Sequence, residues 1–132
     1  MTTKATAKFQ MKGWDENPYA ELEGSKRLVR SSMNGSYEGD IAGESSTEFL
    51  MAYSSDDLAT YVGIERLEGT LGGRTGTFVM QVTGTFAGGV ARHESTVIPG
   101  AGTGDFAGLR GQGTFEAPMG QTAETSLDYD FE

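Results

Sequence analysis

The sequence predicts an all-β fold, namely a closed eight-stranded antiparallel up-and-down (meander) barrel formed by a single domain over residues 1–132. Helical periodicity is nearly absent, and most of the chain consists of stretches rich in Thr, Val, Tyr and Phe. Gly, Asp, Pro or Asn separates these stretches, as turn residues separate strands. A chain of 132 residues has the length of one domain, and such a domain buries about two-thirds of its unfolded surface in a single core.

Turn signals and alternation place the individual strands. The expected strands are residues 4–13, 26–37, 43–54, 58–70, 74–87, 90–98, 108–116 and 122–131. Residue pairs 56–57 (Asp-Asp), 72–73 and 88–89 (both Gly-Gly) mark tight hairpin turns, and "SLDYDFE" alternates apolar residues with acids as a last strand. The recurring "GSYEG", "GTLGG", "GTFAG" and "GDFAG" each place an aromatic residue or Leu at a strand end beside glycine turns. Closing the meander removes exposed edges, and a Greek-key sandwich is the alternative fold.

Composition argues against several classes of function. Ten basic against nineteen acidic side chains give a net charge of −9, which repels nucleic acid and anionic membrane surfaces. The chain has no cysteine and one histidine, so we expect no disulfide, no metal site and no cofactor. The opening "MTTKATAKFQMKGW" shows neither a signal peptide nor a membrane span, and a cytoplasmic protein is expected.

Counting back from each tight turn predicts which residues face one another across the hairpins. A turn at Asp56 and Asp57 pairs Glu48 with Glu65, and the glycine turns then pair Glu65 with Met80. One face carries the larger aromatics and the glycines that a narrow barrel needs, and we take it as the interior. Its members are Glu48, Leu50, Tyr61, Gly63, Glu65, Leu67, Phe78, Met80, Val82, Phe86, His93, Ser95 and Val97.

The opposite face also carries apolar residues. They are Phe49, Met51, Val62, Ile64, Val79 and Ile98. An exposed apolar patch of this kind often marks a subunit interface, so the pattern predicts a homodimer.

Glu48 and Glu65 are candidate catalytic residues if they face each other inside the barrel. Two buried carboxylates repel, so one of them would hold its proton near neutral pH and the pair would combine an acid with a base. Such a pair suits proton transfer in an isomerisation or a cyclisation. The alternative is that both lie hydrated near the barrel rim, or pair with Arg30 or Arg66.

A second group of candidates lies in one predicted row across the sheet. Gly84 would leave a gap between Tyr61 and His93, where a ligand could be hydrogen-bonded from both sides; the alternative is that His93 is satisfied by the protein itself or lies at the rim. Trp14 either plugs one barrel end or stacks on a ligand. The predicted ligand-pocket residues are Trp14, Leu50, Phe78, Met80, Val82 and Gly84.

Several segments together carry a family resemblance: "KGWDENPY", "EFLMAY", "VGIERLEGTLGGRTGTFVMQVTGTFAGGVA", "VIPGAGTGDFAGLRGQGTF" and "LDYDFE". The chain resembles, over nearly its whole length, a family of small and mainly bacterial proteins of unknown function with the allene oxide cyclase-like, calycin-like β-barrel fold. That resemblance implies a closed eight-stranded meander barrel. It also implies relatives by fold that hold a flexible apolar substrate in the barrel and set its shape for ring closure.

Three functions are compatible with these patterns. The first is a barrel that binds an apolar small molecule and acts as a cyclase or isomerase, without a metal or a covalent nucleophile, because pre-folding a substrate alone lowers a barrier. Its catalytic candidates are Glu48, Glu65, Tyr61 and His93. The second is a non-catalytic carrier or sensor of an apolar ligand. The third is a dry structural barrel that acts in assembly.

Overall fold

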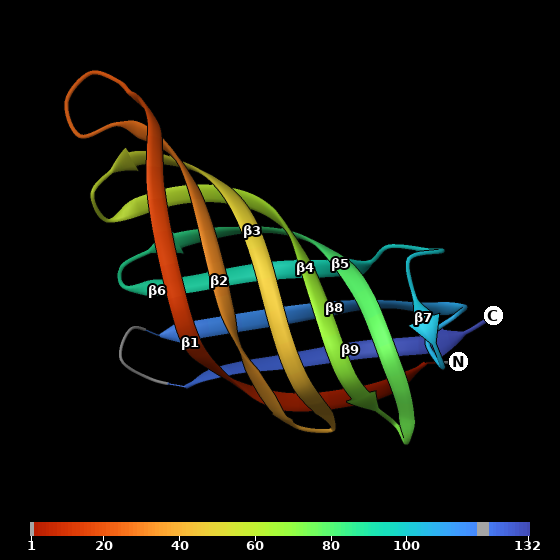
Figure 1. The fold of residues 1–132 in the computed structure, drawn as a ribbon. Coiled ribbons are helices and arrows are strands. Elements are labelled where there is room, and N and C mark those ends of the chain that lie inside the picture. Colours follow the sequence, from red (N-terminus) through yellow and green to blue (C-terminus); the bar gives the residue numbers. More distant parts are fainter. Residues whose placement is uncertain (1, 119–121) are drawn as a thin grey trace.

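The computed structural model describes residues 2–118 and 122–132, which form one antiparallel sheet of nine strands (Figure 1). The strands are β1 (Thr3–Glu21), β2 (Arg27–Gly39), β3 (Ile41–Ser55), β4 (Leu58–Leu71), β5 (Arg74–Ala87), β6 (Val90–Val97), β7 (Thr103–Gly104), β8 (Leu109–Pro118) and β9 (Ala123–Phe131). The all-β prediction is confirmed. Within these described residues, no helix is long and apolar enough to cross a membrane.

Eight of the strands close into a ring. The order runs β1, β2, β3, β4, β5, β6, β8, β9, and β9 pairs again with β1, so that each strand lies beside its neighbours in the chain. This order differs from a Greek key. The two-residue strand β7 lies outside the ring and pairs with β5 at Gly76 and Thr77, which the turn signals did not predict.

Glycine pairs fix the registers of two hairpins. Gly72 and Gly73 have φ of 61° and 79°, and Gly88 and Gly89 have φ of 59° and 80°. Such left-handed pairs form the two-residue turns whose twist matches that of the strands. The predicted pairings of β4 with β5 and of β5 with β6 are therefore confirmed, down to the row that aligns Tyr61, Gly84 and His93.

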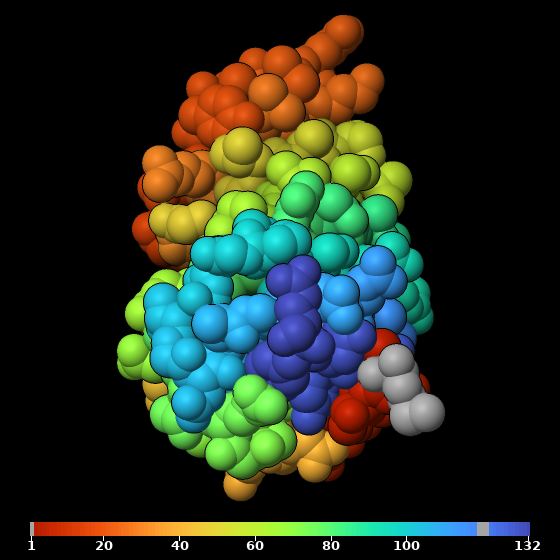
Figure 2. Space-filling model, turned by 90° about the vertical axis from the view of Figure 1, so that its right-hand side faces the viewer, coloured from red at the N-terminus to blue at the C-terminus, as the bar shows by residue number. Residues whose placement is uncertain are grey.

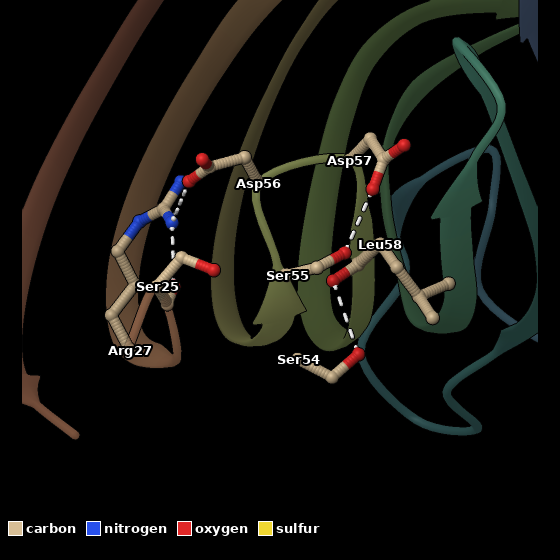
Figure 3. A network of polar contacts seen from close by, with 7 residues as sticks. All are labelled: Ser25, Arg27, Ser54, Ser55, Asp56, Asp57 and Leu58. Carbon is tan, nitrogen blue, oxygen red and sulfur yellow. Dashed lines mark hydrogen bonds and ion pairs between the residues drawn. The ribbon is translucent and has the colours of Figure 1, made fainter. Parts of the chain in front are cut away.

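The hairpin of β3 and β4 differs from the prediction because β3 contains one extra residue. Ser55 faces Leu58 as expected, but Tyr53 faces Ala59, so Ser54 is a β-bulge. The Ser54 hydroxyl donates to the Leu58 carbonyl at 3.5 Å, as Figure 3 shows beside the ion pair of Arg27 with Asp56.

The bulge shifts the rest of β3 by one residue, which turns each of its side chains to the other face. Glu48 faces Ile64 and lies outside, whereas Glu65 faces Thr47. The predicted pairing of Glu48 with Glu65 is wrong. Leu50 is likewise outside at 52% exposure, and Phe49 and Met51 are buried instead.

The interior of the ring holds the core, and its two ends differ. The segment that follows β6 covers one end, where Phe106 is fully buried and packs edge-on against Phe78 at 5.1 Å between ring centroids. Figure 2 looks onto this end and shows that segment beside the hairpin of β4 and β5 and the C-terminal strand. The turn between β5 and β6 and the ends of β8 and β1 lie around the opposite end of the ring.

The first strand makes the opposite end open. β1 pairs with β9 only from Thr3 to Phe9, whereas its pairing with β2 continues to Glu21. The β1–β2 ribbon therefore rises beyond the ring, as Figure 1 shows in red and orange. Pro18 lies in this half of β1, which pairs on one side only, and prolines within sheets are usually confined to such edges.

Candidate functional site

A cavity of about 400 Å³ lies at the open end of the ring. This volume falls within the range of small-molecule sites, which are typically apolar with a few polar groups. Among the described residues, the side chains that line this cavity include three methionines, Met11, Met33 and Met51. It also includes the aromatic residues Phe9, Trp14, Phe49, Tyr53, Tyr61, Phe86 and Phe115.

A larger depression, of about 1050 Å³, lies over β5, β6, β8 and β9 and the adjoining parts of β1 and β2. Its lining is mainly threonine, serine and charged side chains, including Arg92, Glu94 and Glu116. Arg92 and Glu116 are more than half exposed and pair with each other at 3.2 Å. This surface lacks the apolar enclosure that a small molecule needs, so the interior cavity is the candidate site.

Tyr61 and His93 form a polar contact within the cavity lining. The Tyr61 hydroxyl and His93 Nδ1 lie 3.1 Å apart, and the imidazole stacks on Phe115 with 4.2 Å between ring centroids and 2° between planes. Burial lowers the pKa of His93 to about 4, and burial raises the pKa of Tyr61. Both groups are therefore uncharged at neutral pH, and together they offer a hydrogen-bonding point without a charge.

Gly84 has a different role from the predicted gap. Tyr61 and His93 touch directly, so no space for a ligand separates them. A Cβ atom on Gly84 would lie 2.3 Å from the Arg92 carbonyl oxygen and 2.4 Å from His93 Cβ. The missing side chain thus lets β6 approach β5, which holds the imidazole in place, and Gly84 does not line the cavity.

Glu65 lies in the core, away from the cavity lining. It is 3% exposed, and its Oε2 accepts hydrogen bonds from Tyr37 at 2.7 Å and from Ser45 at 2.5 Å. Burial raises the pKa of Glu65, and these two hydrogen bonds oppose the rise. Burial, and then the nearby Glu65, raise the pKa of Tyr37. Thr47, directly across the hairpin, has a buried Oγ1 without a hydrogen-bond partner among the described residues.

Glu48 lies on the outer face of the sheet. It accepts a hydrogen bond from Ser32 and pairs with Arg30 at 3.4 Å, with its own side chain 56% exposed. Glu48 and Glu65 therefore do not share a proton. Of the alternatives for the two glutamates, pairing with Arg30 holds for Glu48, whereas Arg66 pairs with Glu68.

The remaining predicted pocket residues separate into three places. Trp14 lines the cavity, with its ring 6.1 Å from that of Phe49. Phe78, Met80 and Val82 are buried inside the ring as predicted, but they are packed core outside the cavity lining. Leu50 lies on the outer face with Val62 and Ile64, which are each 48% exposed, and the homodimer through such a patch stays a prediction.

The cavity residues that the sequence analysis missed come from two sources. Phe49 and Met51 were assigned to the wrong face because the Ser54 bulge was not foreseen. Phe9 and Phe115 lie on the first strand and on β8, for which no register had been counted, although the period-two alternation of apolar residues was a usable signal. Among residues 2–118 and 122–132, no group of three or more His, Asp or Glu side chains is placed to hold a metal ion.

The fold and the site define a small all-β protein whose ring-closed antiparallel sheet holds an aromatic cavity at one end. The chain belongs to a family described as protein of unknown function, DUF3224, whose model matches residues 5–129. It is similar to a crystal structure of a protein with unknown function from the same family in Shewanella oneidensis, with 29% identity and a TM-score of 0.81. That similarity covers 100% of this chain and 99% of the other. No curated protein matches the chain.

Proposed function

We propose that this protein binds one small apolar molecule in the cavity at the open end of the ring. The observation that carries the proposal is the enclosure itself, because aromatic and methionine side chains surround about 400 Å³. Filling such a space with an apolar molecule removes both ligand and lining from water, and each Å² of apolar surface removed contributes about 25 cal/mol. The methionines suit an irregular ligand, because their flexible thioethers adapt in shape.

The polar pair at Tyr61 and His93 gives the ligand a point of orientation. Since both groups are uncharged near neutral pH, a ligand group that exchanges a hydrogen bond with them need not carry a charge. Specificity in apolar pockets usually comes from a few such placed groups.

We also propose that the chain has the allene oxide cyclase-like fold that the sequence indicated. A ring of eight consecutive antiparallel strands supports assignment to the allene oxide cyclase-like barrels. Eight strands leave room for one small ligand in the lumen. A dry structural barrel is the less supported alternative, because a packed interior would leave no such cavity.

A cyclase or isomerase is the second candidate, and the contact of Tyr61 with His93 favours it. A neutral imidazole bonded to a phenol can move a proton to or from a substrate that lies against it. The cavity walls would pre-fold the substrate. Glu48 and Glu65 cannot transfer protons as a pair, because the two residues lie on opposite faces of the sheet.

Titration with the uncharged fluorescent dye N-phenylnaphthylamine tests the binding function. We expect saturable binding of one dye per chain, with enhanced fluorescence. Ala91 lines the cavity, so Ala91→Phe should fill it and abolish binding. Ala52→Phe is the matched control, because Ala52 is exposed on the outer face of β3. The absence of saturable binding, or unchanged binding by Ala91→Phe with a wild-type circular dichroism spectrum, would refute the proposal.

A further inference from the structure

The mouth of the cavity carries one carboxylate. Glu16 lies on the part of β1 that has left β9, directly across from the buried Ser31 on β2, and it lines the cavity with Trp14. Glu16 is the only Asp, Glu, Lys or Arg in the lining that the described residues form. The cavity therefore has an acidic mouth and no cation.

The surroundings of Glu16 are aromatic. Trp14 Nε1 donates a hydrogen bond to Glu16 Oε2 at 3.3 Å. Burial, and then the nearby Glu16 carboxylate, raise the pKa of Tyr53, which places this carboxylate beside a second ring of the lining. Glu16 takes part in none of the ion pairs found in residues 2–118 and 122–132. A half-buried carboxylate without a cation is thus held beside two electron-rich rings.

A cation that lies beside the cavity lining is already engaged. The Arg27 guanidinium lies over the Tyr53 ring, 3.9 Å from its centroid, and pairs with Asp56 at 3.0 Å. Arg27 does not line the cavity. Its position shows that a ring at this mouth accepts a cation on its face, while Asp56 offsets its charge.

These features favour one class of ligand. We propose that the cavity takes a cationic amphiphile, whose apolar chain fills the aromatic interior and whose positive group lies at the mouth between Glu16 and Trp14. The inference rests on the proposed binding function and names its ligand class. Aromatic faces attract ammonium groups, and tryptophan does so most strongly. An anionic amphiphile would meet Glu16 and no cation, and the net charge of −9 would repel it further.

The length of the site sets the size of the chain. Phe9, at the last pairing of β1 with β9, and Glu16, at the mouth, are seven residues apart on β1. At about 3.3 Å per residue this separation is at most roughly 23 Å, which an extended decyl chain with a bulky head group does not exceed.

Three probes with the same decyl chain test the inference: decyltrimethylammonium and decanoate, each well below its micellar concentration, and decanol below its solubility limit. Trp14 is the single tryptophan of the chain, so its fluorescence reports on the mouth, and calorimetry gives the dissociation constants. We expect the cation to bind about tenfold more tightly than decanol, which corresponds to one partly exposed charge contact. Decanoate should bind more weakly than decanol.

Two charge-matched variants locate the effect. Glu16→Gln should reduce the preference for the cation severalfold, with the attraction to the Trp14 ring left in place, and a wild-type circular dichroism spectrum shows that the variant is folded. Glu21→Gln removes the same charge from an exposed position at the end of β1, outside the cavity lining, and should keep the preference. Equal binding of cation and decanol by the wild type, or equal effects of the two variants, would overturn the inference and leave the binding function standing. Failure of all three probes would overturn both.

Discussion

His93 should make the protein lose stability on mild acidification. The pKa of this imidazole is lowered by burial from 6.5 to about 4, so the folded protein keeps it neutral where the unfolded chain protonates it. Between these values the unfolded state binds more protons, and the free energy of unfolding therefore falls as the pH decreases from 6.5 to about 4. His93 is 7% exposed, so solvent screening is small. The difference between these two pKa values corresponds to about 3 kcal/mol.

The variant His93→Phe isolates this contribution. A phenyl ring preserves the stack on Phe115 and does not titrate. It leaves the Tyr61 hydroxyl without its partner, which costs about 1 kcal/mol independently of pH in this range. Urea unfolding of both proteins between about pH 7 and about pH 4 gives the difference, from which the titration of surface carboxylates cancels. The wild type should lose about 3 kcal/mol more than the variant over this range. Parallel stability curves for the two proteins would refute the reasoning.

Three further predictions concern the core. Burial raises the pKa of Glu65, so the free energy of unfolding of the wild type, relative to that of Glu65→Gln, should fall as the pH rises above the usual glutamate range. Urea unfolding of both proteins at about pH 5 and pH 8 measures this difference. A difference that does not change with pH would contradict the prediction. Thr47→Val removes an unpartnered buried hydroxyl and should raise the free energy of unfolding by about 1 kcal/mol, whereas destabilisation would show that the hydroxyl is bonded. Gly84→Ala should cost about 2 kcal/mol or more, because the new Cβ meets the Arg92 carbonyl oxygen; the neighbouring exposed Thr85→Ala is the control, and equal thermal midpoints would refute the close approach.

The sequence was sufficient for the parts of the fold that local chemistry determines. Gly72–Gly73 and Gly88–Gly89 specify turns of defined length, so counting from them placed Glu65, Tyr61 and His93 on the inner face correctly. The alternation of side chains along a strand then predicted which residues of β4, β5 and β6 are buried, because the face that a side chain occupies depends only on its place along the strand.

The predictions of strand register and length failed where a single extra residue or a strand far along the chain determines the structure. Nothing in "AYSSDDLAT" distinguishes a regular hairpin from one with a bulge at Ser54, yet that bulge moves Glu48 out and Phe49 in. The first strand was expected to end at residue 13, but β1 continues to Glu21 as an edge that pairs only with β2.

The cavity itself depends on tertiary closure. It exists because β1 leaves β9 after Phe9 while Trp14 and Glu16 continue along the ribbon over the open end. No local pattern encodes the distance between this ribbon and the far wall formed by Phe86 and Phe115. The sequence therefore predicted an interior with room for a ligand, but not its position.

The most direct test of the binding account is a map of where an apolar ligand contacts the chain. Two-dimensional NMR spectra, recorded while N-phenylnaphthylamine is added, report each backbone amide separately. Binding in the cavity predicts saturable shifts concentrated at Phe49, Tyr61, His93 and Phe115, which line it. Shifts concentrated at the outer residues Leu50, Val62 and Ile64, or no shifts at all, would contradict it.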